Sequence, residues 1–332
     1  MLRLALPSEG ELQDPSLLFL KGCGLPVERA SARAYMGEIA GLDEIHVMFQ
    51  RNADITAKVE DGSAELGILG KDRFLEVRRD ASNAIPLIED LGYGRCELVL
   101  GIPEGWMDIL AVDDLVELSL EFRRKGRELR VATKYPRLVQ KFLLSRGITY
   151  FSLVQASGTI EAAPAMGYAD IIADISASGV TLRENKLRTI AGGTILKSQA
   201  CLIGNRRLLK DSEKLAATRT LLELFEGHLR AESFYSVTAN LQGASASAIG
   251  KKLLAYPEVS GIKGPTVARV YSRDGHGWYS VTVAVKISDL PKAIERLREL
   301  GSNGMTVLPA HYVFVGECNS YQRLLEALER PS

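Results

Sequence analysis

The chain has 332 residues, 46% of them hydrophobic, and its 41 basic residues balance its 41 acidic ones. A chain without net charge has no overall field that would draw it to nucleic acid or to a membrane surface, so any anionic ligand must be held by local groups. The length is sufficient for more than one hydrophobic core, and we expect two or three domains.

Cysteine and histidine are too scattered to indicate a metal site. The four cysteines contain no CxxC pair, and the four histidines show no HxxxH or HxH spacing, so we interpret the cysteines as reduced. The N-terminus, MLRLALPSEG, turns polar after a short apolar run, unlike a signal peptide. No stretch approaches the ~20 apolar residues that span a bilayer. We therefore expect a cytoplasmic protein that binds neither nucleic acid nor membrane.

Up to about residue 205, short strand-like runs alternate with helical patterns, which favours α/β layers. The expected strands are 2–7, 45–49, 65–70, 96–103, 129–136, 148–154 and 170–175. The expected helices are 15–22, 54–61 and 136–147. The last of these has basic residues in its second half and a terminal glycine, as a helix end prefers.

Two glycine-containing stretches, LGYGRC (91–96) and IAGGTI (190–195), are candidate passages between two lobes. If the chain crosses at the first and returns at the second, a discontinuous lobe I comprises residues 1–93 and 192–220. Lobe II then comprises residues 94–191, and residues 221–332 form a separate C-terminal domain. A ligand cleft between two lobes suits this pattern.

The C-terminal region has a separate succession of predicted strands and helices. A long amphipathic helix over 208–230 leads into strand 235–242, helix 245–257, strands 266–272 and 278–287 around the turn RDGHG, helix 290–301 and strand 305–315. Ser245 or Ser247 is the expected N-cap of the first of these shorter helices. The order β-α-β-β-α-β is the ferredoxin-like arrangement, in which small domains often bind regulatory ligands.

The stretch DISASGVTL, from Asp174 to Leu182, is the strongest candidate for a binding loop. An apolar strand ends there in small residues, which allow a ligand to approach the backbone closely. The loop residues are Ser176, Ala177, Ser178, Gly179, Val180 and Thr181. A helix beginning near Thr181 would aim free N–H groups and a positive dipole end at the same point, which suits a phosphate. The loop lacks the lysine of a nucleotide P-loop.

Two carboxylates, Asp170 and Asp174, flank this loop and would repel a bare phosphate. They suit a ligand that also carries hydroxyl groups or a bound magnesium ion. A phosphate together with vicinal hydroxyl groups describes a phosphorylated ribose. The alternative is that both aspartates only cap the strand ends and the turn. The residues alone leave these two interpretations open.

The segment GTIEAAPAMGYADIIADISASGVTLRENKL (158–187) closely resembles the signature of the ATP phosphoribosyltransferases, which catalyse the first step of histidine biosynthesis. The stretches 59–72, 92–104, 130–136 and 192–207 agree with the same family, so the resemblance covers essentially the whole chain. It implies an α/β fold with a bilobal, periplasmic-binding-protein-like catalytic core. It also implies a C-terminal ferredoxin-like (ACT-like) regulatory domain, as in the long form of the family.

The resemblance further implies a reaction. ATP and phosphoribosyl pyrophosphate would be joined through N1 of the adenine and C1 of the ribose, with Mg²⁺ neutralising the departing pyrophosphate. Histidine would act as feedback inhibitor, and dimers would assemble into a hexamer. By position in the motif, residues 176–181 would cradle the 5-phosphate, Asp174 would face the ribose hydroxyls, and Glu161 is a second catalytic candidate. Gly70, Asp72, Arg95 and Cys96 would line the cleft where ATP binds.

The sequence departs from the family pattern in the turn after the first strand. The family has a Lys-Gly-Arg-Leu-like turn there, whereas this chain reads Ser8-Glu9-Gly10-Glu11-Leu12. Loss of a charge-assisted hydrogen bond costs roughly 1.5–3 kcal/mol. Lys71, Arg95 or Lys134 could supply the missing charge. Leu69 also replaces a threonine of the family.

Three functions follow in order of preference. The first is an active, histidine-inhibited ATP phosphoribosyltransferase. The second is a nucleotide- or histidine-binding regulatory paralogue of the same fold with impaired catalysis, which Glu9 and Glu11 favour. The third, a bilobal solute-binding protein, is disfavoured by the N-terminus and by the tail domain.

Overall fold

The computed structural model describes residues 1–31, 33–79, 82–155, 159–272, 277–302 and 304–329. Its contacts divide the chain into two compact units. The first comprises Met1–Thr218 together with the residues from Arg323 onward, and the second comprises Arg219–Gln322. Gly158 of the signature segment and most of the expected turn RDGHG lie outside the described residues.

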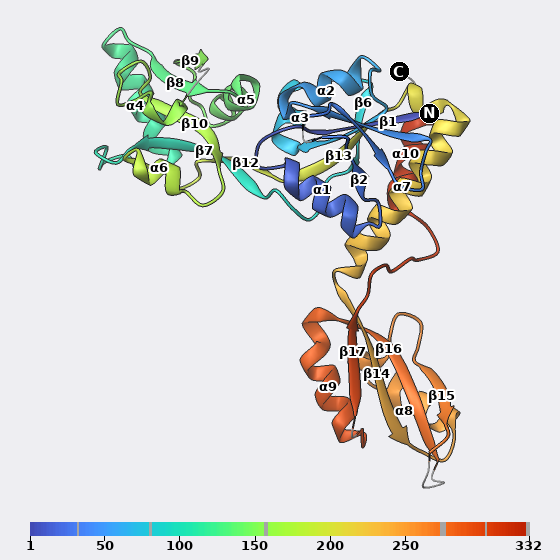
Figure 1. Cartoon of the computed structure of the whole chain (residues 1–332). Coiled ribbons are helices and arrows are strands. Elements are labelled where there is room, and N and C mark those ends of the chain that lie inside the picture. Colours follow the sequence, from blue (N-terminus) through green and yellow to red (C-terminus); the bar gives the residue numbers. More distant parts are fainter. Residues whose placement is uncertain (32, 80–81, 156–158, 273–276, 303, 330–332) are drawn as a thin grey trace. The chain divides into compact units, whose positions relative to one another are not determined.

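The first unit contains two sheets. The larger has the order β2-β3-β4-β1-β5-β13-β6 and is covered by α1 and α2 on opposite faces (Figure 1). Strands β1, β4 and β5 are parallel, and β13 inserts antiparallel between β5 and β6. The elements are β1 (Leu2–Pro7), α1 (Gln13–Gly22), β2 (Val27–Glu28), β3 (Met36–Ile39), β4 (Ile45–Gln50), α2 (Asn52–Glu60), β5 (Leu66–Gly70), α3 (Lys71–Val77), β6 (Ala84–Ile88) and β13 (Ala200–Asn205).

The second sheet has the order β11-β7-β10-β8-β9, with β12 also paired to β7. Its elements are β7 (Cys96–Pro103), α4 (Val112–Arg124), β8 (Leu129–Thr133), α5 (Pro136–Ser145), β9 (Phe151–Gln155), η1 (Ile160–Ala162), β10 (Ile171–Ser176), α6 (Val180–Glu184), β11 (Leu187–Arg188) and β12 (Thr194–Ser198). Strand β10 runs on consecutive buried residues from Ile171 to Ala173, as expected for a strand covered on both faces.

The chain passes between the two sheets at two adjacent places. It leaves the first sheet after β6, and Leu91 and Tyr93 exchange backbone hydrogen bonds of 3.0 Å with Ala200 on the way. It returns between Ser198 and Ala200, because β12 still pairs with β7. The return therefore lies a few residues beyond the limit at 191/192 that the glycines of IAGGTI indicate.

The second unit has a four-stranded antiparallel sheet in the order β15-β16-β14-β17. Its elements are β14 (Phe234–Gln242), α8 (Ala246–Leu254), η3 (Pro257–Val259), β15 (Thr266–Val270), β16 (Trp278–Lys286), η4 (Ile287–Asp289), α9 (Leu290–Glu299) and β17 (Met305–Pro309). Ser245 accepts a 3.1 Å hydrogen bond from the N–H of Ala248, which confirms it as the N-cap of α8. The ferredoxin-like order is confirmed, although β17 ends six residues before the expected limit.

Two helices and a 3₁₀ turn complete the chain: η2 (Leu208–Lys210), α7 (Ser212–Ala231) and α10 (Asn319–Glu329). Sequence analysis did not predict α10, or α4 in the second sheet's layer. The expected fold class, an α/β bilobal core followed by a ferredoxin-like domain, is confirmed.

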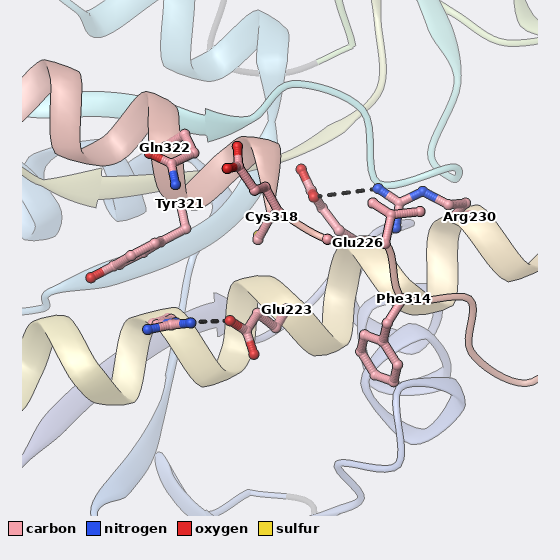
Figure 2. A pocket seen from close by; sticks show the side chains of 11 residues that line it. Glu223, Glu226, Arg230, Phe314, Cys318, Tyr321 and Gln322 are labelled. Carbon is pink, nitrogen blue, oxygen red and sulfur yellow. Dashed lines mark hydrogen bonds and ion pairs between the residues drawn. The ribbon is translucent and has the colours of Figure 1, made fainter. Parts of the chain in front are cut away.

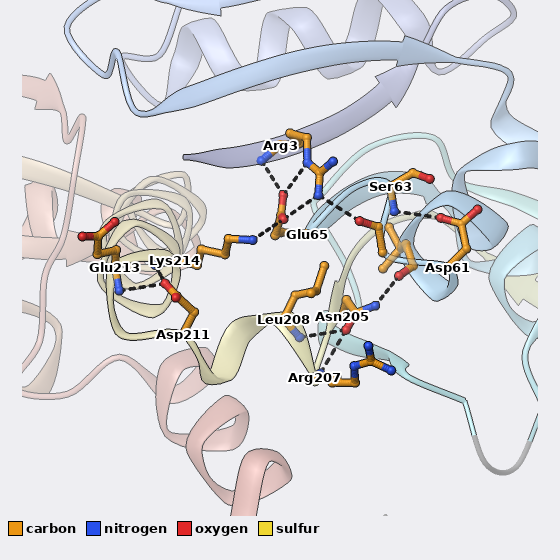
Figure 3. Close-up of polar contacts among 12 residues, drawn as sticks. Arg3, Asp61, Ser63, Glu65, Asn205, Arg207, Leu208, Asp211, Glu213 and Lys214 are labelled. Atoms are coloured by element: carbon orange, nitrogen blue, oxygen red, sulfur yellow. Dashed lines mark hydrogen bonds and ion pairs between the residues drawn. The ribbon is translucent and has the colours of Figure 1, made fainter.

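A buried carboxylate ties the start of α7 to the first sheet (Figure 3). The Glu65 side chain is inaccessible to solvent and accepts hydrogen bonds from the Arg3 guanidinium at 2.8 and 3.0 Å and from Lys214 Nζ at 2.7 Å. Burial by itself would raise the pKa of Glu65, but the hydrogen bonds from Arg3 and Lys214 outweigh it and hold the pKa at about 2. Two cations on separate elements thus share one ionised group.

This ion triad predicts a pH-dependent stability. Because folding lowers the Glu65 pKa from 4.5 to about 2, its contribution is complete above 4.5 and is lost as the pH falls toward 2. We expect Glu65→Gln to destabilise the protein by about 2–3 kcal/mol near neutral pH. Thermal unfolding of wild type and variant across that pH window measures the difference. A gap that persisted unchanged to pH 2 would contradict the assignment.

Candidate functional site

The candidate loop follows β10, a central strand of the second sheet. Strand β8 lies parallel beside β10, with Thr133 opposite Ala173, so the residues that follow the two strands meet at one edge of the sheet. Asp174 comes from β10, and Lys134 follows β8. This edge is where ligands bind in sheets with parallel strands.

Asp174 is a half-buried carboxylate, and its described hydrogen bond is a 2.8 Å contact from the N–H of Ile175. Burial raises its pKa, the negative charge of Glu161 adds to the rise, and the positive charges of Lys134 and Arg73 act against it. Glu161 lies in η1 and is also half-buried. The charge of Glu161 therefore lies close enough to Asp174 to affect the ionisation of Asp174.

The loop itself is held by its own side chains. The N–H of Gly179 donates to Ser176 Oγ at 3.0 Å, and the guanidinium of Arg183 reaches the carbonyl of Ser178 at 3.4 Å. Gly179 has a φ of +71°, a left-handed conformation that favours glycine. Within the described part of the chain, the N–H groups of Ala177 and Ser178 donate no hydrogen bond. These two donors are available to an anion.

The two aspartates of the motif have different surroundings. Asp170 is buried and bonded to the side chains of Arg127 and Arg130 at 2.5 and 3.1 Å, and it also accepts the N–H of Arg130 at 2.9 Å. Burial would raise its pKa, but the hydrogen bonds from Arg130 hold the pKa below its usual value. Asp170 thus has a structural role, whereas Asp174 has no such partner among its described contacts.

Asp72 is already bonded within the protein. Its Oδ1 accepts the Ser198 hydroxyl at 2.7 Å and its Oδ2 accepts the Tyr135 hydroxyl at 2.7 Å, and the residue is only 5% exposed. Gly70 caps α3, and a Cβ there would lie 2.5 Å from Asp72 Oδ1, so the position requires glycine. The structure therefore places Asp72 between the two sheets of the unit rather than in open space.

Arg95 and Cys96 stand at the first passage between the sheets. Arg95 is exposed and forms a 3.3 Å ion pair with Asp90. Cys96 is half-buried, and burial raises the pKa of its thiol to about 11, so it is uncharged and unreactive near neutral pH. Neither residue makes a described contact with Asp174.

Three basic residues were candidates to replace the charge missing from the turn at Glu9 and Glu11. Lys71 is paired with Glu89 at 2.7 Å and Arg95 with Asp90, whereas Lys134 acts on Asp174. Glu9 and Glu11 are both exposed, and Glu9 lies 4.0 Å from Arg51. Sequence analysis missed Arg73, which follows β5 and has no motif of its own to identify it.

A cavity of the second unit has both of its arginines paired with glutamates. This cavity of about 360 Å³ is lined by α7, α10 and the segment before it (Figure 2). Its arginines are paired with its glutamates, Arg219 with Glu223 at 2.8 Å and Arg230 with Glu226 at 3.6 Å. Glu226 also accepts the N–H of Ser320 at 2.7 Å. We therefore place the candidate site in the first unit.

Comparisons with known proteins identify the family. A family model described as ATP phosphoribosyltransferase matches residues 51–227, which include Asp174, Glu161 and the loop, and one described as the HisG C-terminal domain matches residues 231–312. The chain is 36% identical to "ATP phosphoribosyltransferase 2, chloroplastic" of Arabidopsis thaliana, over 98% of this chain and 80% of the relative. It is 32% identical to "ATP phosphoribosyltransferase" of Bradyrhizobium diazoefficiens, over 98% of both chains.

A solved structure supports the same family assignment. The ATP phosphoribosyl transferase (HisG:HisZ) complex from Thermotoga maritima superposes with a TM-score of 0.52 and 26% identity, over 68% of this chain and 96% of that one. The chain belongs to the ATP phosphoribosyltransferase family, and the resemblance seen in its motifs is confirmed.

Across the described residues, no helix is both long and apolar enough to span a membrane. The same residues contain no cluster of three or more His, Cys, Asp or Glu side chains that could hold a metal ion.

The contrast between the two aspartates predicts opposite effects on stability. Asp170→Asn should lower the unfolding free energy by about 2 kcal/mol, because it removes the charge that Arg127 and Arg130 surround. Asp174→Asn should leave stability unchanged or raise it, because an ionised group is disfavoured where burial raises the pKa. That advantage should fade as acid protonates Asp174 in the wild type. Thermal unfolding of both variants tests this, and equal destabilisation would contradict it.

Proposed function

We propose that this chain transfers the phosphoribosyl group of phosphoribosyl pyrophosphate to N1 of the adenine of ATP, the first step of histidine biosynthesis. The observation that carries the proposal is the family match over residues 51–227, which contains the whole candidate site. The open N–H groups of the loop and the half-buried carboxylates of Asp174 and Glu161 beside it support the same reaction.

The proposed reaction needs no protein nucleophile. The lone pair of adenine N1 forms a bond to ribose C1 while the bond from C1 to the pyrophosphate oxygen breaks, and pyrophosphate leaves with that electron pair. Positive charge builds up on the ribose ring in the transition state. Positioning and charge stabilisation supply the catalysis in such a displacement.

Each loop and carboxylate residue has a proposed role. Residues 176–181 hold the 5-phosphate through N–H groups and hydroxyls, as phosphates are held at turns of this kind. Asp174 accepts hydrogen bonds from the ribose hydroxyls, and its negative charge favours the cationic transition state. Glu161 adds a second negative charge, and Gly70 lets substrate approach the end of β5. Asp72 supports this arrangement through Tyr135 and Ser198.

The carboxylates present fit Mg²⁺, which is commonly held by one or two carboxylates together with substrate phosphates. Asp174 and Glu161 would be its protein ligands. When bound, the ion neutralises negative charge on the departing pyrophosphate.

The assay is direct. With ATP, phosphoribosyl pyrophosphate and Mg²⁺, the wild type should form the N1-ribosylated adenine chromophore, and omission of Mg²⁺ should abolish it. Gly179→Val should lower kcat/KM for phosphoribosyl pyrophosphate at least a hundredfold, because a branched side chain cannot adopt φ +71° without strain. Val180→Ala, an exposed change in the same loop, is the control. Equal rates for the two variants would exclude the loop from the site.

The turn at Glu9 and Glu11 supports a second candidate, a regulatory paralogue that binds nucleotide or histidine but catalyses poorly. If the exposed carboxylates repel the polyphosphate, Glu9→Lys should raise kcat/KM for ATP about tenfold, since one charge-assisted contact is gained. Glu38→Lys, an exposed reversal of the same charge on β3, is the control. A wild type that binds ATP, forms no product and stays inactive after Glu9→Lys would favour the second candidate.

We also propose that histidine inhibits the enzyme through the second unit and that the chain forms dimers that assemble into a hexamer. The match of residues 231–312 to the C-terminal domain of the family supports both. Histidine titration of the activity and sedimentation of the intact chain test them. The expected cytoplasmic location stays a prediction, because two relatives are named as chloroplastic.

A further inference from the structure

A side chain of helix α3 caps the amino end of helix α5, although the two helices lie in the layers of different sheets. The Glu76 carboxylate accepts the N–H of Arg137 at 2.9 Å and the N–H of Leu138 at 3.0 Å, and Glu76 is only 8% exposed. These donors belong to the first turn of α5, where N–H groups lack partners within the helix and the dipole favours a negative charge. Tyr135, the N-cap residue, supplies no side-chain cap.

The contact is reciprocal. Arg137 Nη1 donates to the carbonyl of Glu76 at 2.8 Å and to the carbonyl of Arg78 at 2.7 Å. These carbonyls lie at the end of α3, where no later turn of helix would satisfy them. Each helix therefore supplies the hydrogen-bonding groups that the other helix's end lacks.

The same face of α3 holds the residues just before α5. Asp72, one turn before Glu76, accepts the Tyr135 hydroxyl. The Arg73 guanidinium lies 4.3 Å from the centre of the Tyr135 ring. Three side chains of α3, those of Asp72, Arg73 and Glu76, thus fix the segment from Tyr135 to Leu138.

That segment follows directly on Lys134, whose positive charge acts on Asp174. The hydrophobic core of the second sheet does not include α3, and the core around Phe74 does not include α5. Tyr135 itself belongs to the core of the second sheet, so loss of the contact between the helices would leave both cores packed and free the second sheet's layer to shift relative to α3.

We propose that Glu76 is a positioning residue of the transfer reaction, holding the amino end of α5 against α3 so that Asp174 and the phosphoribosyl loop stand correctly relative to the end of β5. This rests on the proposed function. Glu76 itself touches no substrate and acts through the α5 backbone.

The test compares Glu76→Gln with Glu60→Gln. Glutamine has one acceptor oxygen, and its amide NH₂ cannot accept the second N–H. Glu60 is the matched control, because its carboxylate accepts the N–H groups of Asn83 and Ala84 at 2.9 and 2.8 Å within the first sheet's layer. We expect Glu76→Gln to lower kcat about tenfold per folded molecule, with KM values changed less than threefold. Glu60→Gln should lower the Tm comparably and leave both constants unchanged.

A purely structural Glu76 would behave like Glu60, with kcat and KM unchanged after correction for the folded fraction, and that result would overturn the proposal. A wild type without activity would instead contradict the proposed function. A second measurement does not depend on activity. Spin labels at Asp54→Cys and Glu117→Cys, with Cys96 and Cys318 changed to serine, report the distance between the two sheets' layers. Glu76→Gln should broaden the distance distribution between the sheets and Glu60→Gln should not. An unbroadened distribution in Glu76→Gln would also overturn the proposal.

Discussion

The antiparallel pairing of β7 with β12 is the constraint on which the first unit depends. Cys96 stands opposite Ser198 and Glu97 opposite Lys197, so the chain enters and leaves the second sheet on neighbouring strands. Gly94, with a φ of +68°, makes the turn before β7, and a Cβ there would lie 2.3 Å from the Leu12 side chain. Two passages joined by backbone hydrogen bonds hold the sheets together at one edge. Contacts elsewhere must set the angle between them.

Those contacts come from α3. This seven-residue helix begins at the end of β5 and carries two buried carboxylates, Asp72 and Glu76, both bonded to the second sheet's layer. Ser198, the last residue of β12, also donates to Asp72. Polar groups in such a place are expensive to bury unless every oxygen is bonded, and here both oxygens of each carboxyl group are. The arrangement joins the passage, the helix and the Lys134–Tyr135 turn into one network.

In the candidate site, by contrast, a partly buried carboxylate is left with few hydrogen-bond partners. Burial raises the pKa of Asp174, and few protein hydrogen bonds offset that rise, whereas Asp170, four residues earlier, is bonded to two arginines. A group that is desolvated and left without partners costs stability, and binding of a ligand can recover that cost. Asp170, just before β10, therefore stabilises the layer, and Asp174, within β10, remains available for chemistry.

The sequence by itself determined the local features: the apolar strand β10, the small residues of the loop, the serine cap of α8, and the family to which their spacing belongs. Each follows from a side-chain pattern within a short stretch of chain. It could not reveal α10, whose packing partners lie elsewhere in the chain, or the partners of Asp72, Glu76 and Asp170. Only the tertiary structure decided which acid is bonded and which is open. The reason is that ionisation and hydrogen bonding depend on groups 40 to 126 residues away, such as Arg130 for Asp170 and Ser198 for Asp72.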